Sequence, residues 1–293
     1  MAFKSGFVNI IGKPNAGKST LLNALSGQKL SIVTPKAQTT RQRITAVLTG
    51  KDYQIIFSDT PGWIDTPRYE MHRAMLRAIE SALEDADILM LLADVRESPE
   101  QAGELPDKLR NVRKPVFLVL NKTDLVTHET VNQSIENWKQ LNLFAEILPV
   151  SALLQSNLDQ LKSALIAYLP THPPYYPEDT LTDKTLRFLA SEIIREKIFL
   201  HYREEIPYSC EVYITDYRET PQMDYIRAEI LVERDSQKAI LIGKGGSALK
   251  QVGMASRKDI EEMVGKQVML ELHVKVAKNW RNNRSYLKRL GYS

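Results

Sequence analysis

Residues Gly12–Ser19 read GKPNAGKS and lie between an apolar run at Phe7–Gly12 and a helical segment at Lys18–Ser26. They match the pattern G-x-x-x-x-G-K-[ST], which is informative when a strand precedes it and a helix follows it. Glycine allows backbone conformations that turn N–H groups toward a phosphate, and the helix N-terminus adds positive partial charge. The stretch therefore predicts a phosphate-binding loop rather than an ordinary glycine-bearing turn.

This loop supplies most of the nucleotide contacts that we expect. The Lys18 ammonium is placed to reach the β- and γ-phosphates and to neutralise charge on the phosphoryl group in transfer. The Ser19 hydroxyl is placed to bind Mg²⁺. The residues expected to contact the nucleotide here are Gly12, Lys13, Pro14, Asn15, Ala16, Gly17, Lys18, Ser19 and Thr20.

A second motif, DTPG at Asp59–Gly62, ends the apolar run Tyr53–Ser58. Asp59 is expected to hold Mg²⁺, either directly or from just behind its ligands. The N–H of Gly62 is expected to sense the γ-phosphate, which gives this residue a part in hydrolysis. Alone, DTPG is also typical of an ordinary turn, but here it falls where a phosphate site needs a carboxylate.

A third motif, NKTD at Asn121–Asp124, ends the apolar run Val116–Leu120. The Asp124 carboxylate is suited to accept two hydrogen bonds from the ring N–H and the exocyclic amine of guanine, a donor pair that adenine lacks. Asn121 is expected to tether the loop, and Lys122 lies between them in the same site. An Asn/Asp turn would explain NKTD alone, but three motifs in order predict a guanine-nucleotide site.

A last loop at Ser151–Ala152 follows the apolar Ile147–Val150 and is expected to touch the base through backbone N–H groups. Around these motifs, apolar runs such as Ile88–Ala93 alternate with amphipathic segments such as Glu70–Glu84. This alternation predicts an α/β domain with a doubly wound, largely parallel sheet and its ligand loops at the carboxyl ends of the strands.

Four prolines within LPTHPPYYPEDT then interrupt the pattern. Proline cannot continue the preceding helix and favours an extended, semi-rigid spacer. We therefore expect a nucleotide-binding domain at residues 1–172, a linker at 173–181 and a second domain at 182–293.

The second domain is expected to run αββααβ, as an α+β fold with an antiparallel three-stranded sheet covered by helices. Between two of its helices lies GKGG, Gly243–Gly246, without the Lys-[ST] of a second phosphate loop. Residues 236–293 carry 12 basic and 4 acidic residues, and such a concentration of positive charge suggests a polyanionic partner. Ile240 and Ile242 are expected to form the floor of a base groove.

Across residues 1–172 the sequence resembles the P-loop GTPases related to translation factors. The resemblance assigns the switch threonine, which closes on Mg²⁺ and the γ-phosphate, to Thr40, with Thr39 as the competing assignment. Trp63 stands where Ras-like enzymes have the glutamine that orients water, so water is positioned without it or turnover needs a partner. Asn15 resembles the asparagine that ligates K⁺ in cation-activated GTPases, and it equally suits a simple loop cap.

The GKGG loop within αββααβ resembles a type II KH domain, a module that clamps about four single-stranded nucleotides. The residues expected to bind RNA are Ile242, Gly243, Lys244, Gly245, Gly246, Lys250, Lys278 and Arg281. Both halves in this order resemble the Era family of bacterial GTPases in small-subunit assembly. That resemblance implies binding to the 3′ end of small-subunit ribosomal RNA and to the small ribosomal subunit, cofactors GTP or GDP with Mg²⁺, and a cytoplasmic monomer in peripheral contact with the inner membrane.

Composition limits the alternatives. The single cysteine, Cys210, excludes an intramolecular disulfide, and we expect it to be a buried core thiol. The N-terminal residues show no secretion signal, and no apolar stretch is long enough to span a membrane. Two other functions remain open at this stage: an RNA chaperone that uses GTP only as a structural ligand, and a membrane-surface GTPase whose basic tail binds lipid.

Overall fold

The computed structural model describes residues 2–64 and 66–292, which form two compact units. The first unit holds the residues up to Ser31 together with Thr40–Pro67 and Ala74–Asp183. The second holds Ile32–Thr39, Arg68–Arg73 and the residues from Lys184 onward. The chain thus passes between units at 183–184, and two short segments from the first half of the sequence group with the second unit.

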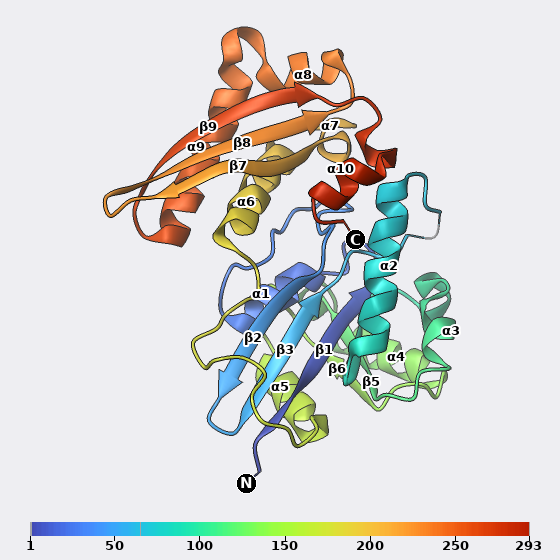
Figure 1. Cartoon of the computed structure of the whole chain (residues 1–293). Helices are drawn as coiled ribbons and strands as arrows, with labels where there is room; N and C mark the ends of the chain where they lie inside the picture. Colours follow the sequence, from blue (N-terminus) through green and yellow to red (C-terminus); the bar gives the residue numbers. More distant parts are fainter. Residues whose placement is uncertain (1, 65, 293) are drawn as a thin grey trace. The chain divides into compact units, whose positions relative to one another are not determined.

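The first unit is built on a six-stranded sheet of order β2-β3-β1-β4-β5-β6 (Figure 1). The strands are β1 (Lys4–Gly12), β2 (Ile44–Gly50), β3 (Tyr53–Asp59), β4 (Ile88–Asp94), β5 (Val116–Asn121) and β6 (Glu146–Pro149). The strand β2 pairs antiparallel with β3 and every other pair is parallel. Because β1, β3 and β5 are parallel, the ends of all three emerge at the same edge of the sheet.

Helices cover this sheet. They are α1 (Lys18–Ser26), α2 (Glu70–Asp85), α3 (Leu105–Leu109), α4 (His128–Lys139) and α5 (Leu158–Tyr168), with 3₁₀ turns η1 (Pro99–Ala102) and η2 (Thr123–Leu125). Buried side chains of α2, α3 and α4, such as Ile79, Leu105 and Trp138, pack with Leu91 and Leu118 of the central strands. Fully burying an aliphatic side chain contributes about 1.5–3 kcal/mol, so this cluster fixes the strand ends that carry the motifs.

The proline-rich segment, which we expected to be an extended, semi-rigid spacer, is held against the first unit by hydrogen bonds. The N–H groups of Tyr175 and Tyr176 donate to Gln54 Oε1 over 2.8 and 3.0 Å. The Val47 N–H donates to the Leu181 carbonyl over 2.9 Å, which extends the attachment to the end of the segment. Nonlocal hydrogen bonds of this kind hold the segment although proline excludes it from a helix.

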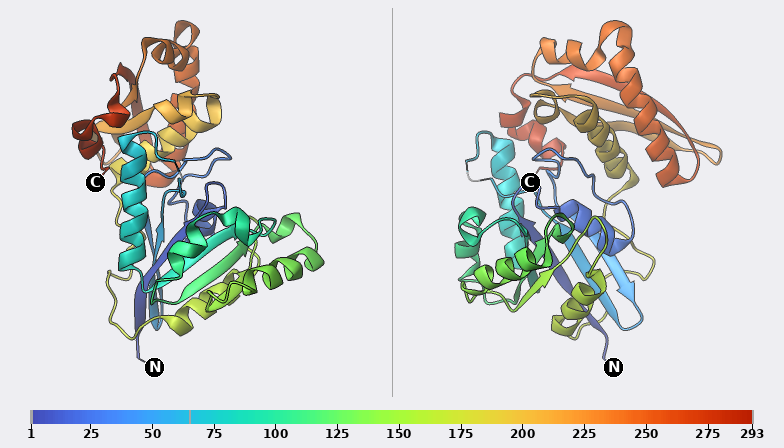
Figure 2. Two further views of the ribbon diagram at one scale, coloured as in Figure 1. Left: turned by 90° about the vertical axis from the view of Figure 1, so that its right-hand side faces the viewer. Right: turned by 180° about the vertical axis from the view of Figure 1, so that it is seen from behind.

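The second unit is built on a three-stranded sheet of order β7-β8-β9 (Figure 1), and its longer helices cover the face of the sheet that is turned toward the viewer on the right of Figure 2. Its elements are α6 (Leu186–His201), α7 (Ile206–Ser209), β7 (Glu211–Glu219), β8 (Met223–Val232), α8 (Asp235–Ile242), η3 (Lys244–Gly246), α9 (Ser247–Val264), β9 (Gln267–Val276), η4 (Trp280–Asn282) and α10 (Arg284–Arg289). The expected all-antiparallel sheet is wrong for one pair, since β8 and β9 are parallel. The helices α8 and α9 form the crossover that a parallel pair requires.

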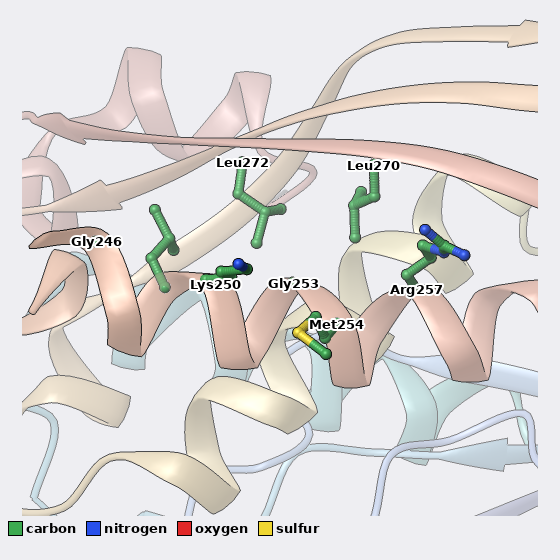
Figure 3. Close-up of a pocket in the computed structure, with 8 residues that line it drawn as sticks. Gly246, Lys250, Gly253, Met254, Arg257, Leu270 and Leu272 are labelled. Atoms are coloured by element: carbon green, nitrogen blue, oxygen red, sulfur yellow. The ribbon is translucent and has the colours of Figure 1, made fainter.

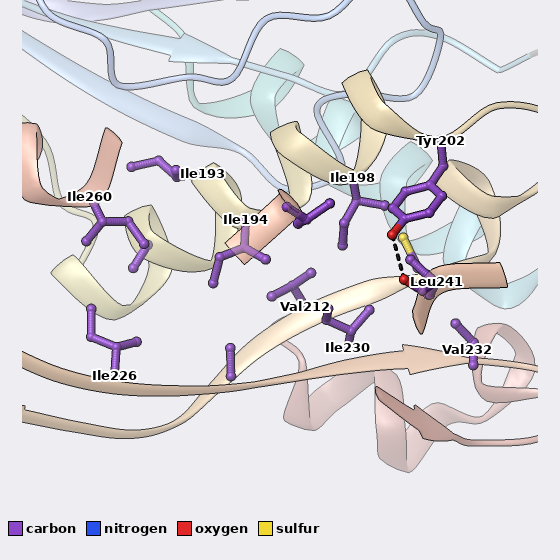
Figure 4. Packing of buried hydrophobic residues seen from close by; sticks show 14 of the residues in the cluster. Ile193, Ile194, Ile198, Tyr202, Val212, Ile226, Ile230, Val232, Leu241 and Ile260 are labelled. Atoms are coloured by element: carbon purple, nitrogen blue, oxygen red, sulfur yellow. Dashed lines mark hydrogen bonds between the residues drawn. The ribbon is translucent and has the colours of Figure 1, made fainter. Parts of the chain in front are cut away.

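The core of this unit lies between α6, α9 and the sheet (Figure 4). Ile194 and Ile198 of α6 are fully buried above Val212 and Ile230. Cys210 is fully buried in the same cluster, as predicted from the sequence. Trp280, near the C-terminus, is also fully buried, and its Nε1 donates to the Ser209 carbonyl over 3.0 Å. This hydrogen bond anchors the basic tail to the second unit.

Hydrogen bonds also connect the C-terminal end of α6 to Lys36 and to α8 in this unit. The Lys36 ammonium donates to the carbonyls of Phe199 and Tyr202, at the C-terminal end of the helix where a cation is favoured. The Tyr202 hydroxyl donates to the Leu241 carbonyl of α8 over 2.6 Å (Figure 4).

Among the described residues, no helix is long and apolar enough to cross a membrane.

Candidate nucleotide site and nucleic-acid groove

The phosphate loop joins β1 to α1, as the sequence predicted. Lys18 lies in the first turn of α1, and its Nζ donates to the carbonyls of Gly12 and Lys13 over 3.0 and 2.8 Å. Burial lowers the pKa of Lys18 to about 8, although the Asp59 carboxylate opposes this shift. A buried ammonium at a helix N-terminus, in a loop of this shape, is a site for phosphate oxygens.

Behind the loop, Asp59 gathers three hydroxyl groups. Its Oδ2 accepts from Ser19 over 2.6 Å, from Ser31 over 2.9 Å and from Thr40 over 3.1 Å. Its Oδ1 is buried and has no hydrogen-bond partner. Burial raises the pKa of Asp59, while Lys18 and the hydroxyls oppose that shift. An orphaned buried carboxylate oxygen beside hydroxyl groups fits a hard divalent cation such as Mg²⁺.

The structure separates the two candidate switch threonines. Thr40 Oγ1 lies 2.8 Å from Ser19 Oγ, so it belongs to the Asp59 cluster. Thr39 Oγ1 instead donates to the Lys36 carbonyl over 2.7 Å. The geometry therefore favours Thr40 at the cation site.

Gly62 and Trp63 both lie against the phosphate loop. A Cβ on Gly62 would come within 2.9 Å of Pro14 Cγ, so glycine is needed for this close approach to the phosphate loop. The Trp63 N–H donates to the Gly12 carbonyl over 3.2 Å, and its indole is buried in the core cluster, with Lys108 Nζ 4.9 Å from the ring centroid. The indole thus acts in packing at this turn.

The base-reading loops are held together by Asn121. Its Nδ2 donates to the Ala16 carbonyl over 2.9 Å, and its Oδ1 accepts from the Ala152 N–H over 3.0 Å. One side chain therefore ties the phosphate loop to the last loop, which is the tether expected from the sequence. The Asp124 carboxylate accepts from the Ser151 hydroxyl, so Asp124 and Ser151 lie side by side at this end of the sheet.

Asp94, at the end of β4, supports the same loop and was not predicted. Lys122 Nζ lies 3.0 Å from its carboxylate, and Arg96 donates three hydrogen bonds to it, one from the backbone N–H and two from the guanidinium. Although burial opposes the shift, the hydrogen bonds from Arg96 and Lys122 hold the pKa of Asp94 well below its usual range. A signal was present in the sequence, because Asp94 directly follows the apolar run Ile88–Ala93, just as Asp59 and Asn121 come at the ends of theirs.

The remaining loop residues have simpler surroundings. Asn15 is exposed and has φ 64°, a left-handed conformation that asparagine tolerates better than most residues. Lys13 Nζ donates to the Gln101 carbonyl, and the partly buried Thr20 follows Ser19 in α1. This left-handed backbone suits asparagine whether or not its side chain binds an ion.

In the second unit, a groove of about 320 Å³ runs between α9 and β9, beginning beside the GKGG loop (Figure 3). Its floor contains Leu270 and Leu272 of β9, and Lys250 and Arg257 of α9 stand at its rim. The lining residues are Gly246, Leu249, Lys250, Gly253, Met254, Arg257, Leu270 and Leu272. A narrow apolar floor with a cationic rim suits unpaired bases and their phosphates.

The two units match two family models. Residues 7–122 match a model described as 50S ribosome-binding GTPase, and residues 205–281 match the KH domain model. GTPase Era of Staphylococcus haemolyticus is 46% identical over 291 residues, which cover 99% of this chain and 97% of that protein. The chloroplastic GTPase ERA1 of Zea mays is 42% identical, with 99% and 70% covered.

The chain belongs to the Era family of GTPases. A crystal structure of Aquifex aeolicus Era bound to GDP and AlF₄⁻ has a TM-score of 0.95 and 40% identity, covering 99% of this chain and 100% of that one. A structure of Era in complex with MgGDPNP and nucleotides 1506–1542 of 16S ribosomal RNA has the same TM-score and identity, with 99% of each chain covered. The predicted fold, a P-loop GTPase domain followed by a KH domain, is confirmed.

Within this Era-family chain the predicted RNA residues fall into two groups. Lys244 and Lys250 are exposed, at the GKGG loop and along the groove, and Lys278 is exposed after β9. Arg281 is instead only 13% exposed, paired with Glu233, and its guanidinium lies 4.0 Å from the Tyr69 ring centroid. In the structure Arg281 therefore pairs with Glu233 and packs on Tyr69, and its phosphate contact stays a prediction.

The predicted floor residues, Ile240 and Ile242, lie outside this groove, and their contact with RNA stays a prediction. Ile240 is half exposed, and neither it nor Ile242 lines the groove. Leu270 and Leu272 lie there instead. The signal was present as the alternation of β9, which puts both leucines on the same face as the buried Val268, but the alternation also fits a plain core strand.

Proposed function

We propose that this Era-family GTPase binds GTP with Mg²⁺ in the first unit, hydrolyses it there, and uses the GKGG loop and groove to bind the 3′ region of small-subunit ribosomal RNA. In this way it assists maturation of the small ribosomal subunit. The observation that carries the proposal is the Asp59 cluster: a buried carboxylate with one orphaned oxygen beside Ser19 and Thr40. It provides a cation site next to the phosphate loop.

The chain's own residues divide the chemistry. Lys18 binds the β- and γ-phosphates and stabilises charge in the transition state. Ser19 and Thr40 hold the cation with Asp59, and the Gly62 N–H meets the γ-phosphate. Mg²⁺, when bound, neutralises charge between the phosphates. Trp63 takes no chemical part, because its indole is packed in the core.

The RNA part of the proposal is supported by the solved complex of Era with nucleotides 1506–1542 of 16S ribosomal RNA, by the match to the KH model and by the cationic groove. A fluorescent RNA of that sequence, titrated with protein loaded with GDPNP or GDP, tests it. We expect tight binding that depends on the loaded nucleotide, and weak binding of a scrambled RNA. Equal affinity for the two RNAs would contradict the proposal.

We further propose that Asn15 contributes to a K⁺ site beside the phosphates, because its side chain is exposed within the phosphate loop. Replacing K⁺ by Na⁺ at fixed ionic strength should slow hydrolysis with little change in GTP affinity. Asn15→Gly keeps the left-handed backbone but removes the ligand, so it should lose the K⁺ dependence. Identical rates in the two salts would leave Asn15 as a loop residue only.

A further inference from the structure

A buried serine outside the sequence motifs contacts the carboxylate of the proposed cation site. Ser31 is only 1% exposed, and its hydroxyl donates to Asp59 Oδ2 over 2.9 Å. None of the motifs that predicted the nucleotide site contains Ser31. Burying a hydroxyl is unfavourable unless it is hydrogen-bonded, so the contact with Asp59 is what stabilises a polar side chain at this position.

The hydroxyl groups around Asp59 are more than one oxygen can accept. Ser19, Thr40 and Ser31 all lie within hydrogen-bond distance of Oδ2, whereas Oδ1 has no hydrogen-bond partner among the described residues. An ionised carboxylate offers about two lone-pair sites on each oxygen, so three protons do not fit on Oδ2 together. Ser19 and Thr40 have an alternative, because their oxygens lie 2.8 Å apart and one can donate to the other. One of these two hydroxyls and that of Ser31 then fill Oδ2.

Asn23 of α1 fixes Ser31 through the backbone. Its Oδ1 accepts from the N–H groups of Leu30 and Ser31 over 3.0 and 2.9 Å, and its Nδ2 donates to the Ser31 carbonyl over 2.7 Å. None of these groups is expected to contact the nucleotide or the cation. Thr40 differs, because it is the residue expected to close on the γ-phosphate. The position of the Ser31 hydroxyl therefore does not depend on which nucleotide is bound.

We propose that Ser31 is a positioning residue for Asp59: its hydroxyl holds Oδ2, so that Oδ1 faces the cation with either GDP or GTP in the site. The inference rests on the proposed function, since it concerns the Mg²⁺ that Asp59 holds there. Groups that hydrogen-bond a metal-binding carboxylate fix its orientation, and removing one typically lowers metal affinity by about 10-fold to 100-fold. Ser31 keeps the carboxylate oriented while Ser19 and Thr40 turn their lone pairs to the cation.

The test measures how the affinities for fluorescent GDP and GDPNP depend on the concentration of free Mg²⁺. Ser31→Ala should raise the Mg²⁺ concentration that gives half of the effect by about 10-fold to 100-fold with both nucleotides. Thr40→Ala should raise it only with GDPNP, because GDP has no γ-phosphate on which Thr40 could close. Ser134→Ala is the matched control, since it removes a buried hydroxyl that has no hydrogen-bond partner among the described residues. It should leave the Mg²⁺ dependence unchanged.

A second variant guards against misfolding. Asn23→Ala keeps the Ser31 hydroxyl but removes the three hydrogen bonds that fix it, so it should also raise the Mg²⁺ requirement with both nucleotides. Unchanged Mg²⁺ dependence of Ser31→Ala, or a change confined to GDPNP, would overturn the inference. If thermal unfolding shows that Ser31→Ala is not folded, the same result from Asn23→Ala would overturn it. If Asp59→Asn then still raises the Mg²⁺ requirement, the proposed cation site survives, and if it does not, both fail.

Discussion

The two loops that begin with Gly-Lys, Gly12–Ser19 and Gly243–Gly246, differ in what surrounds them. A Cβ on Gly17 would lie 2.3 Å from Asn121 Nδ2, because the protein packs directly against the first loop. A Cβ on Gly245 would meet nothing within 4 Å. Both glycines have positive φ, 99° and 60°, so both loops need glycine for their backbone, but only the first needs it for space.

The lysines show the same contrast. Lys18 is only 6% exposed and its pKa is lowered by burial, whereas Lys244 is exposed. An enclosed, preorganised loop suits a small ligand that is surrounded on all sides. An open loop suits a polymer that enters and leaves the site. The difference therefore predicts different consequences for equivalent substitutions.

The largest effect is expected on hydrolysis. Lys18→Ala should reduce the turnover rate by at least about 100-fold to 1,000-fold, since it removes a charge aimed at the transition state. Lys244→Ala, the matched change in the open loop, should leave phosphate release unchanged, and Trp63→Ala should alter it only modestly. If Trp63→Ala abolishes turnover as fully as Lys18→Ala, the packing role given to Trp63 is wrong.

The preference for guanine should depend only on the nucleotide site of the first unit. Asp124→Asn replaces an acceptor pair by a group that also donates, so GTP should weaken and xanthosine nucleotides should be favoured. Each charge-assisted hydrogen bond lost should cost about 1.5–3 kcal/mol. Equilibrium titration with both nucleotides measures this, and equal affinity of the unmodified protein for GTP and ATP would contradict the guanine assignment.

The next substitutions change the exposed GKGG loop of the second unit. Lys244→Asp with Gly245→Asp puts two carboxylates where phosphates approach, so RNA affinity should fall by at least about tenfold. The remaining binding should depend less on salt, since log K falls with log salt by about 0.7 per phosphate neutralised. GTP affinity should be nearly unchanged.

Controls separate charge from folding in that experiment. Lys258→Asp alters an exposed lysine of α9 that does not line the groove, so it reproduces the charge reversal of Lys244→Asp, two of the three unit charges that the double variant changes, without touching the site. Thermal unfolding shows whether the double variant is folded. A folded double variant with full RNA affinity would show that GKGG is only a turn.

The smallest effect is a pH dependence of the enclosed lysine. Since the pKa of Lys18 is about 8 in the protein, while bound phosphates favour the charged form, GTP affinity should fall above pH 8 by at most about tenfold per pH unit. The unfolded chain holds its lysine proton up to about pH 10.5, so the contribution of Lys18 to the free energy of unfolding rises between those values. Lys18→Met should remove both trends, and a flat affinity profile for the unmodified protein would contradict them.

The enclosed loop was also the part best predicted from sequence. Its conformation follows from residues within Gly12–Ser19 and the two elements that flank them, so a local pattern suffices. The choice between Thr39 and Thr40 depended on Asp59, which reaches the site only through the pairing of β1 with β3. No local pattern contains that information.

Other features of the fold also depend on nonlocal contacts that the sequence pattern does not show. The parallel pairing of β8 and β9 depends on two helices crossing between them, and the attachment of the proline-rich segment depends on Gln54, far away in the sequence. To predict the floor of the groove, one would need to know which residues on one face of β9 the helices leave uncovered. Periodicity identifies the face but does not show what covers it.

The burial of Trp280 has an optical consequence. The protein has three tryptophans, and Trp63 and Trp138 both lie in the core cluster of the first unit. Trp280 is fully buried in the second unit with its indole N–H on the Ser209 carbonyl. Changing Trp63 and Trp138 to phenylalanine therefore leaves an indole whose emission reports only on the RNA-binding half, and Trp280→Phe leaves emission only from the half that binds GTP.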